Sequence, residues 1–453
     1  MSSIEQLRSS VSGRVIEAGD AEYDEARQVY NFMIDKRPRV VVSCASPSDV
    51  AATIGFAREA GLDISVRGGS HSVPGFGTGD DAVVVDLSGM QGVSVDETGL
   101  GRIQGGATLG AVNEALTPLG LAFPAGIIST TGAGGLTLGG GIGYLSRRCG
   151  LSVDNIVSAQ VVLASGDVVE ASEAENPELL WALKGGGGNF GVVTEFRVRL
   201  HRVDGVLAGP MFFELDDGPA VFRFFREFIK DAPREYGGFP LFNQAPPLPF
   251  IPENRVGEPF AGVMHCWSGD PAEGEAIVAR FREVATPMAE HVATMSVADV
   301  NSMFDPLVPR GLQHYWKAAF VKELTDEALA AHFEHAPRLP SMNSTMHMYP
   351  INGACHDVPQ EATAFGHRDA SFATVIAGMW PDPTENEANT QWVRDYYDAI
   401  APHSEPGAYI NFASSDDSGK AVDNYGANYE RLQQVKRQYD PGNLFHLNQN
   451  VLP

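Results

Sequence analysis

Short apolar runs alternate with amphipathic segments along the first 200 residues. Short apolar runs are typical of buried strands, and apolar positions three and four apart are typical of helices. The pattern predicts strands at 39–43, 64–67, 82–87 and 101–105 and helices at 50–60 and 109–116. Further along it predicts a strand pair at 156–163 and 168–171, a helix at 176–184 and a strand at 192–200. The pair is separated by Ala-Ser-Gly-Asp, which is a hairpin signal.

The pattern changes after about residue 205, where glycine becomes rarer and proline and aromatic residues become more frequent. Predicted helices at 219–230, 271–284 and 325–335 alternate with predicted strands at 260–267, 344–349 and 371–379. This indicates a separate α+β domain. The tail from about residue 407 is predicted to return to a strand, a loop and a helix at 425–439.

Glycine is concentrated in two stretches of the N-terminal part. The run Arg-Gly-Gly-Ser-His-Ser at 67–72 ends a predicted strand, and seven of the twelve residues at 132–143 are glycine. Glycine lets backbone N–H groups approach an anion closely, and Ser70 and Ser72 add hydroxyl donors. Most Gly-Gly pairs, taken alone, belong to ordinary tight turns. Together the stretches predict backbone packed against a large flat ligand, with no regular element at 132–143.

Two common nucleotide-binding motifs do not fit. The segment 186–191 matches G-x-G-x-x-G, but a predicted helix precedes it and a predicted strand follows it, which is the reverse of a dinucleotide-binding Rossmann turn. No glycine-rich stretch ends in the Gly-Lys-Ser/Thr of a P-loop. Nucleophile elbows and H-E-x-x-H helices are also missing from the sequence, so hydrolase chemistry has no support.

Length, charge and cysteine usage narrow the class of protein further. A chain of 453 residues predicts more than one domain, and its net charge of −25 argues against nucleic acid or anionic membranes as partners. Neither a membrane-spanning run nor a signal peptide is evident, so we expect a cytoplasmic protein. The four cysteines are far apart, which argues against a disulfide scaffold or structural zinc.

One histidine pair resembles half of a metal site. His332 and His335 lie one helical turn apart with Glu334 nearby, but a third ligand is missing. We therefore interpret them as part of a solvated helix face and expect no metal.

Several motifs together resemble a known family. They are Arg-Gly-Gly-Ser-His at 67–71, Pro-Ala-Gly at 124–126 with the stretch up to 143, Gly-Leu-Ser-Val-Asp-Asn at 150–155, Gly-Gly-Gly-Gly-Asn-Phe-Gly at 185–191, Asn-Tyr-Glu-Arg-Leu at 428–432, Tyr-Asp-Pro-Gly-Asn-Leu-Phe at 439–445 and Asn-Gln-Asn at 448–450. The chain resembles the berberine-bridge-enzyme-like branch of the vanillyl-alcohol-oxidase, or PCMH-type, flavoproteins. The resemblance implies an α+β fold. An FAD-binding domain of two α+β subdomains would span 1–205 and 405–453, and an inserted α+β substrate domain with an antiparallel sheet would span 206–404.

The resemblance also implies FAD as cofactor. The backbone of 67–72 would cradle the pyrophosphate, and His71, otherwise interpreted as capping a turn, would be linked covalently to the flavin 8α-methyl. The residues that the resemblance places at FAD are Arg67, Gly68, Gly69, Ser70, His71, Ser72, Gly126, Ser129, Thr130, Thr131, Gly134, Gly135, Gly139, Gly140, Gly143, Tyr144, Asp154, Asn155, Val192, Val193, Asn448 and Gln449. Many relatives add a second link from a cysteine in Ala-Gly-x-Cys-Pro-Thr. Ile128 holds that position here, so we expect a single link and interpret Cys149 as a small buried residue.

Tyr409 and Asn411 are the candidate catalytic pair. On a strand they would share one face, so the amide of Asn411 could polarise the phenol of Tyr409. Spacing alone favours a half-buried strand with one polar face. The resemblance, through its Y-x-N element, implies that Tyr409 removes a proton from the substrate. An ordinary tyrosine pKa is about 10, so this role requires a group that lowers it.

Three further residues have candidate roles. The resemblance places Thr131 beside the flavin C4a, where relatives often carry valine or leucine, and a small polar residue there would be compatible with O₂ reaching the ring. His347 and Tyr349 lie on the alternating run 344–349 and could face the substrate or be ordinary sheet residues.

The function that the resemblance implies is an FAD-dependent oxidoreductase. We expect an oxidase of a small organic alcohol or amine. Tyr409 would take a proton, hydride would pass to flavin N5, and O₂ would reoxidise the flavin and yield H₂O₂. The alternatives are a flavin dehydrogenase with another acceptor, a flavin oxygenase of secondary metabolism and a non-catalytic flavin-binding protein. The substrate and the oligomeric state do not follow from the sequence.

Overall fold

The computed structural model describes residues 3–417 and 419–453. The first part of the chain forms a small four-stranded sheet. Its strand order is β1-β2-β4-β3, with bounds β1 (Arg14–Glu17), β2 (Val40–Ser43), β3 (Ile64–Arg67) and β4 (Val83–Asp86). The valines of β2 and β4 are fully buried, as is usual for parallel strands covered on both faces. The neighbouring helices are α1 (Ile4–Ser10), α2 (Tyr23–Ala26) and α3 (Pro47–Ala60). The Ser46 hydroxyl caps α3, and Gly61 ends it with a left-handed φ of 67°.

A five-stranded antiparallel sheet follows in the order β5-β6-β10-β8-β9. Its strands are β5 (Val93–Val95), β6 (Gly101–Gln104), β8 (Ile156–Val162), β9 (Val168–Ser172) and β10 (Val192–Val198). The helices of this part are α4 (Leu109–Leu116), α5 (Ala133–Gly139), α6 (Ser146–Cys149) and α7 (Pro177–Leu183), and a short ladder joins β7 (Leu121–Ala122) to β11 (His201–Arg202). The predicted β8–β9 hairpin is confirmed.

Helix α5 corrects the prediction of no regular element at 132–143. Ala133 and Leu138 of this helix pack into the main hydrophobic core. This burial outweighs the cost of helical glycine, which is about 1 kcal/mol per residue relative to alanine.

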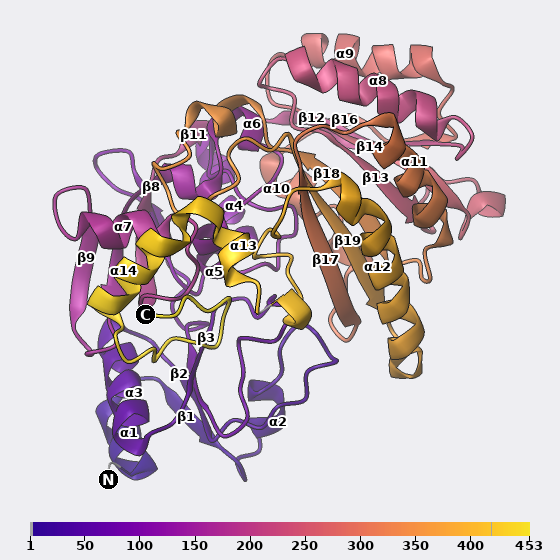
Figure 1. The fold of residues 1–453 in the computed structure, drawn as a ribbon. Coiled ribbons are helices and arrows are strands. Elements are labelled where there is room, and N and C mark those ends of the chain that lie inside the picture. Colours follow the sequence, from indigo (N-terminus) through magenta and orange to yellow (C-terminus); the bar gives the residue numbers. More distant parts are fainter. Residues whose placement is uncertain (1–2, 418) are drawn as a thin grey trace.

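The middle of the chain forms one large antiparallel sheet in the order β15-β12-β14-β13-β18-β19-β17, with β16 also paired to β12. Its strands are β12 (Val206–Phe213), β13 (Phe239–Gln244), β14 (Pro259–Trp267), β15 (Ala289–Glu290), β16 (Ala293–Met295), β17 (Gln313–Val321), β18 (Thr345–Pro350) and β19 (Phe372–Trp380). Its helices are α8 (Gly218–Asp231), α9 (Pro271–Val284), α10 (Val297–Ser302), α11 (Asp326–His335) and α12 (Asn386–Ile400). Figure 1 shows α8, α9, α11 and α12 on one side of this sheet and the N-terminal part on the other.

The prediction that His332 and His335 lie on a solvated face of helix α11 is wrong for His332. Its side chain is buried, and its Nδ1 lies 2.7 Å from the Tyr396 hydroxyl of α12. The helix packs against α12, so its inward residues are part of the core. Within the described residues, no group of three or more histidine, cysteine, aspartate or glutamate side chains is placed to hold a metal ion.

The end of the chain returns to the N-terminal part as α13 (Ala421–Tyr425) and α14 (Tyr429–Tyr439) (Figure 1). Helix α14 ends where the helix predicted at 425–439 ends but begins four residues later, because Gly426, with a φ of 53°, ends α13 at the predicted start. The buried ammonium group of Lys436 in α14 donates to Asp440 and to the carbonyls of Asn189 and Phe445. This contact fixes the C-terminal tail to the glycine-rich loop before β10.

Arg147 of α6 ties the N-terminal part to the large sheet. Its buried guanidinium donates to the carbonyls of Ala232, Pro233 and Tyr236 beyond the end of α8, and to Oδ1 of Asn352. Burial lowers the pKa of Arg147 to about 10, so the side chain is still charged at neutral pH. A cation among carbonyls at a helix C-terminus is favourable.

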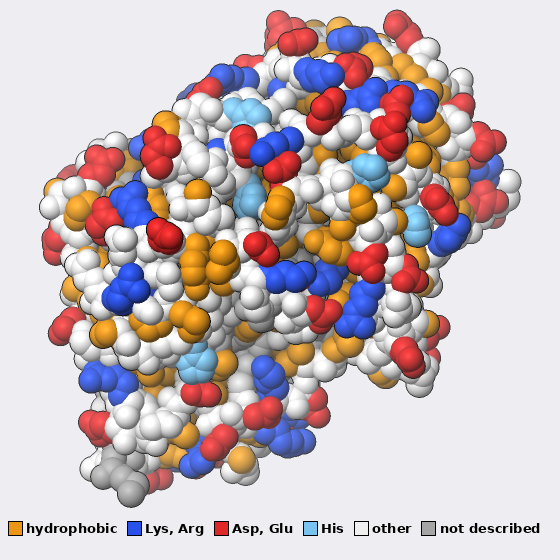
Figure 2. All heavy atoms as spheres, viewed as in Figure 1, with side chains coloured by type: hydrophobic (Ala, Val, Ile, Leu, Met, Phe, Trp, Pro, Cys, Tyr) orange, Lys and Arg blue, Asp and Glu red, His pale blue; other side chains and the backbone are white. Residues whose placement is uncertain are grey.

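The surface carries both signs of charge. Figure 2 shows acidic and basic side chains interspersed on one face, with no basic patch gathered there. In the described part of the chain, no helix is long and apolar enough to cross a bilayer.

Candidate active site

A cavity of about 350 Å³ lies between the N-terminal part and one face of the large sheet. The N-terminal part contributes glycine-rich segments at 68–69, 132–135 and 187–188. Strands β17, β18 and β19 form the opposite wall, and residues between 445 and 449 close one side. The cavity therefore brings together segments that are far apart in the sequence.

The two glycine-dense stretches touch each other at this cavity. A Cβ on Gly69 would lie 2.2 Å from the backbone nitrogen of Gly132, and a Cβ on Gly132 would lie 2.3 Å from that of Gly69. Neither position tolerates a side chain, whereas a Cβ on Gly135 would meet nothing within 4 Å. The result is a wall of bare backbone, which suits the flat ring and the diphosphate of FAD.

His71 lies on this wall with an ordered imidazole. Thr130 Oγ1 lies 3.0 Å from its Nε2, Thr131 Oγ1 lies 3.4 Å from its Nδ1, and the Tyr30 ring stacks on it at 3.8 Å. Burial, with a smaller contribution from Arg310, lowers the pKa of His71 to about 3. The imidazole is therefore neutral at physiological pH, and one ring nitrogen keeps a lone pair that can form a covalent bond.

Tyr409 and Asn411 are in contact, but the strand predicted for them is wrong. The segment forms a turn in which the Phe412 N–H donates to the Tyr409 carbonyl at 2.9 Å. Asn411 Nδ2 donates to the Leu136 carbonyl (2.9 Å) and to the Tyr409 hydroxyl (2.8 Å). This side chain to backbone bond competes with strand pairing and holds the turn against α5.

The phenol oxygen of Tyr409 accepts two hydrogen bonds, from Asn411 and from the Gly141 N–H at 2.7 Å. Both bonds lower the pKa of Tyr409 by stabilising the phenolate, but burial is the larger effect and raises the pKa to about 12. The surrounding rings are those of Phe320, Phe365 and Phe412. No cation in the described residues contributes to this shift, and the N–H donors do not offset the effect of burial.

The C-terminal tail places two amides at the cavity. Asn448 Nδ2 donates to the Gly188 carbonyl, and the Gln449 carbonyl accepts from Asn189 and Tyr425. Asn448 Oδ1 and Gln449 Nε2 are buried, and neither has a hydrogen-bond partner in the described residues. Buried polar groups are normally paired. An acceptor and a donor left free beside a bare backbone wall fit the polar edge of a flavin.

Comparison with known proteins also indicates an FAD-binding protein. Residues 38–172 match the FAD binding domain family, and residues 408–452 match the berberine and berberine like family. The chain is 31% identical to (R)-6-hydroxynicotine oxidase of Paenarthrobacter nicotinovorans, with 98% of this chain and 97% of that protein covered. It is 30% identical to the FAD-linked oxidoreductase YgaK of Bacillus subtilis, with 98% of each covered. The crystal structure of 6-hydroxy-D-nicotine oxidase from Arthrobacter nicotinovorans superposes with a TM-score of 0.86 at 27% identity over 98% of both chains.

The chain belongs to the berberine-bridge-enzyme-like FAD-linked oxidoreductases. It is an FAD-dependent enzyme with the α+β fold of that family, as the sequence resemblance predicts.

The cavity of this oxidoreductase is lined by most of the residues predicted to bind FAD. Those that line it are Arg67, Gly68, Gly69, Ser70, His71, Ser72, Gly126, Thr131, Gly134, Gly135, Val192, Val193, Asn448 and Gln449. Others support the wall from behind: a Cβ on Gly139 would meet the Asn411 amide, and one on Gly140 would meet the rings of Tyr409 and Phe365. Gly143 packs in the same way on the Ala125 carbonyl.

Besides Gly139, Gly140 and Gly143, five of the predicted FAD contacts do not line the cavity. Ser129 bonds to Asp305, Thr130 reaches the site only through His71, and Tyr144 packs on Phe239. Asn155 donates to the carbonyls of Cys149 and Leu151, and Asp154 binds an arginine. The polar groups of Ser129, Asp154 and Asn155 are therefore engaged within the protein, whereas the buried Tyr144 hydroxyl has no hydrogen-bond partner in the described residues.

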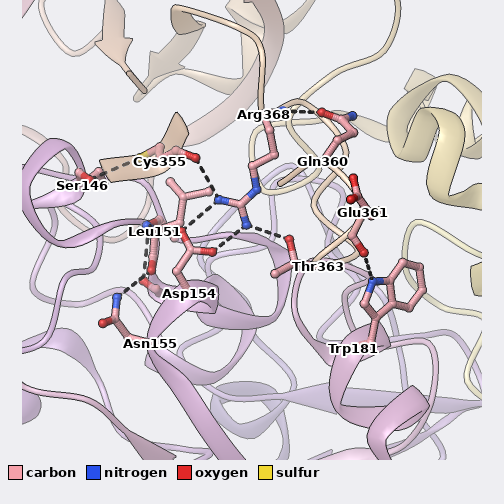
Figure 3. A network of polar contacts seen from close by, with 12 residues as sticks. Ser146, Leu151, Asp154, Asn155, Trp181, Cys355, Gln360, Glu361, Thr363 and Arg368 are labelled. Atoms are coloured by element: carbon pink, nitrogen blue, oxygen red, sulfur yellow. Dashed lines mark hydrogen bonds and ion pairs between the residues drawn. The ribbon is translucent and has the colours of Figure 1, made fainter. Parts of the chain in front are cut away.

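Asp154 forms a buried ion pair with Arg368, which comes from the loop before β19 (Figure 3). The guanidinium donates to Oδ2 at 2.9 Å and to Oδ1 at 2.6 Å, and it also binds the Thr363 hydroxyl. Asp154 accepts a further bond from the Leu151 N–H. The pair therefore joins the FAD-binding part to the segment that follows β18.

We expect Asp154→Asn to lower the free energy of unfolding by about 3–5 kcal/mol, because it leaves the buried charge of Arg368 uncompensated. The urea midpoint of the FAD-loaded enzyme measures this effect. Glu178→Gln is the control, since Glu178 forms a two-point pair with Arg431 at the exposed surface and should lose less than about 1 kcal/mol. Equal shifts for the two variants would contradict the prediction.

The side of the cavity formed by β18 includes both predicted substrate residues. His347 and Tyr349 line it, and His347 Nδ1 lies 2.7 Å from the Tyr349 hydroxyl. Ile128, at the position of the second flavin link in some relatives, also lines the cavity, whereas Cys149 is a buried free thiol outside the lining.

Sequence reasoning missed several aromatic residues of the site, and three of them contact predicted site residues or line the substrate side. Tyr30 stacks on His71, Trp316 of β17 lines the substrate side, and Phe412 packs against Tyr409. Phe412 follows Asn411 directly in the chain and was the easiest of the three to identify. Tyr30 and Trp316 lie in segments without any motif.

Proposed function

We propose that this enzyme is an oxidase that removes a proton and a hydride from a small organic alcohol or amine and uses O₂ as electron acceptor. The proposal depends on one observation: the Tyr409 side chain lines the cavity, and its hydroxyl oxygen accepts hydrogen bonds from two N–H groups. The phenolate form of this oxygen can accept a proton, and both donors stabilise that form against the opposing effect of burial.

The residues of the chain have separate tasks. When bound, FAD supplies the hydride acceptor and the site at which O₂ is reduced. The glycine wall and the tail amides of Asn448 and Gln449 would orient the flavin. Asn411 and the Gly141 N–H would hold the Tyr409 oxygen toward the substrate, and the apolar rings around it would keep water away.

We propose a single covalent link to the flavin, through His71. Its neutral imidazole, fixed between two threonine hydroxyls and the Tyr30 ring, supports this assignment. A second link is not proposed, because Ile128 has no nucleophilic atom and the four cysteines of the chain lie outside the cavity lining.

The acceptor can be tested before the substrate is known. The bound flavin is reduced by light under anaerobic conditions and then mixed with air-saturated buffer. An oxidase reoxidises much faster than free reduced FAD and releases one H₂O₂ per flavin. Reoxidation no faster than that of free FAD, with rapid oxidation by an added quinone, would show a dehydrogenase. An oxygenase would place an atom of labelled O₂ in an organic product once a substrate is found.

Thr131 should control access of O₂ to the flavin. We expect Thr131→Leu to slow reoxidation by about tenfold, equivalent to about 1.4 kcal/mol of barrier, because leucine fills space beside the wall at His71. Stopped-flow absorbance of the flavin-loaded fraction measures the rate. Thr131→Ser retains the hydroxyl without adding bulk and should behave like wild type, and equal rates for leucine and serine would argue against this role.

A further inference from the structure

The cavity is nearly free of charge. Among its described lining residues the only charged side chain is Arg67, at the end near β3. The Arg67 guanidinium is already engaged with Asp86 Oδ2 at 2.7 Å and the Ala26 carbonyl at 2.6 Å. The substrate side thus offers neither a cation for a carboxylate or phosphate nor an anion for an ammonium group.

The wall opposite the glycine loops is mostly apolar. Successive side chains of a strand point to opposite faces, so β18 presents Thr345, His347 and Tyr349 to the cavity and buries Met346 and Met348 in the core under the helices. The neighbouring strand β19 adds only apolar side chains, namely Val375, Ala377 and Met379. His347 and Tyr349 form a polar pair on this surface, and Thr345, Asn243 and Asn343 are the other polar side chains of the sheet side. Thr345 Oγ1 and Asn343 Nδ2 are already bonded to the Phe242 and Leu307 carbonyls.

His347 has one ring nitrogen available. Its Nδ1 is bonded to the Tyr349 hydroxyl at 2.7 Å, and the rings of Phe239 and Tyr349 pack on it at 5.0 and 5.5 Å. In the described residues no hydrogen bond involves its Nε2. Burial lowers the pKa of His347 to about 3, so this nitrogen belongs to an uncharged ring.

We propose that the substrate side of this cavity admits an uncharged, mostly apolar molecule and that Nε2 of His347 forms a hydrogen bond to the polar group of that molecule. The proposal rests on the function proposed above and narrows its substrate class. An ion entering this space would lose its hydration without gaining a partner, which disfavours its binding. An amine would bind as the free base.

The first test compares two probes of one shape and different charge, benzamide and benzoate, on the FAD-loaded enzyme. Each is titrated while the absorbance bands of the bound flavin are recorded, and calorimetry gives a second measure of binding. We expect benzamide to bind at least ~10-fold more tightly than benzoate. Benzoate binding as tightly as benzamide, or benzamide failing to bind up to its solubility limit, would overturn the proposal.

The second test addresses His347 itself. His347→Leu removes Nε2 and should weaken benzamide binding by ~10-fold or more, whereas His347→Gln retains a polar group and should restore most of it. Met346→Leu is the control, because Met346 points to the opposite face of β18. Once a substrate is known, His347→Leu should raise KM by a larger factor than it lowers kcat. Benzamide affinity equal in wild type and His347→Leu would overturn the assignment.

These outcomes are separate from those that test the oxidase. Reoxidation by O₂ does not depend on His347 or on either probe. Slow reoxidation together with tighter binding of benzamide than of benzoate would therefore reject only the proposal that the enzyme is an oxidase. Fast reoxidation with preferred binding of benzoate would reject only the substrate class.

Discussion

Replacing Tyr409 by phenylalanine is expected to lower the rate of flavin reduction by at least ~10²-fold, because a positioned general base contributes about this much. The phenol oxygen is the atom on which Asn411 and the Gly141 N–H converge, and its removal would leave both donors without their acceptor. Anaerobic stopped-flow measurement of flavin absorbance gives the rate directly. Tyr30→Phe is the matched control, since the Tyr30 hydroxyl bonds the Val308 carbonyl and its ring also lines the cavity.

The pH dependence of the same rate is a stricter test. The proton-accepting form is the phenolate, and burial holds the pKa of Tyr409 near 12. Below that pKa the phenolate fraction rises with pH, tenfold per unit. The reductive rate of the wild type should therefore increase between pH 7 and 10, and Tyr409→Phe should lose this increase. The same slope in both proteins would mean that another group accepts the proton.

Elements with complete local signals were predictable from the sequence. The helix predicted at 271–284 has the same bounds in the structure, because Asp270 caps it and Pro271 occupies its first turn. The β8–β9 hairpin was defined by its turn residues. Helix α5 was missed, because its stability comes from tertiary packing of Ala133 and Leu138 and its own sequence disfavours a helix.

The site was predictable only where contacts involve short motifs. The proximity of Tyr409 and Asn411 follows from their spacing, although a turn rather than a strand brings them together. Asp154 and Arg368 are 214 residues apart, and no local pattern links them. A motif shared with a family indicates that Asp154 matters, but its partner is visible only after the chain has folded.

Replacing His71 by alanine is expected to abolish covalently retained flavin altogether. The wild-type chain, precipitated in acid, should keep the yellow colour and show the added mass of one FAD, and the His71→Ala chain should show neither. The bare backbone wall at Gly69 and Gly132 and the tail amides are unchanged in the variant, so FAD should still bind the folded protein without a covalent bond.

Ser72→Ala is the control for this experiment, because it removes a hydroxyl of the same loop that bonds only the Phe76 N–H, and the link should persist. Colour retained by acid-precipitated His71→Ala would place the link on another residue. Flavin released from the wild type by acid would reject a covalent bond and leave His71 a neutral side chain of the flavin wall. A covalent link is expected to raise the potential of the flavin, so loss of the link without loss of FAD should also slow the reductive step. The slowing should be smaller than that of Tyr409→Phe, because the Tyr409 oxygen and its two donors remain in place.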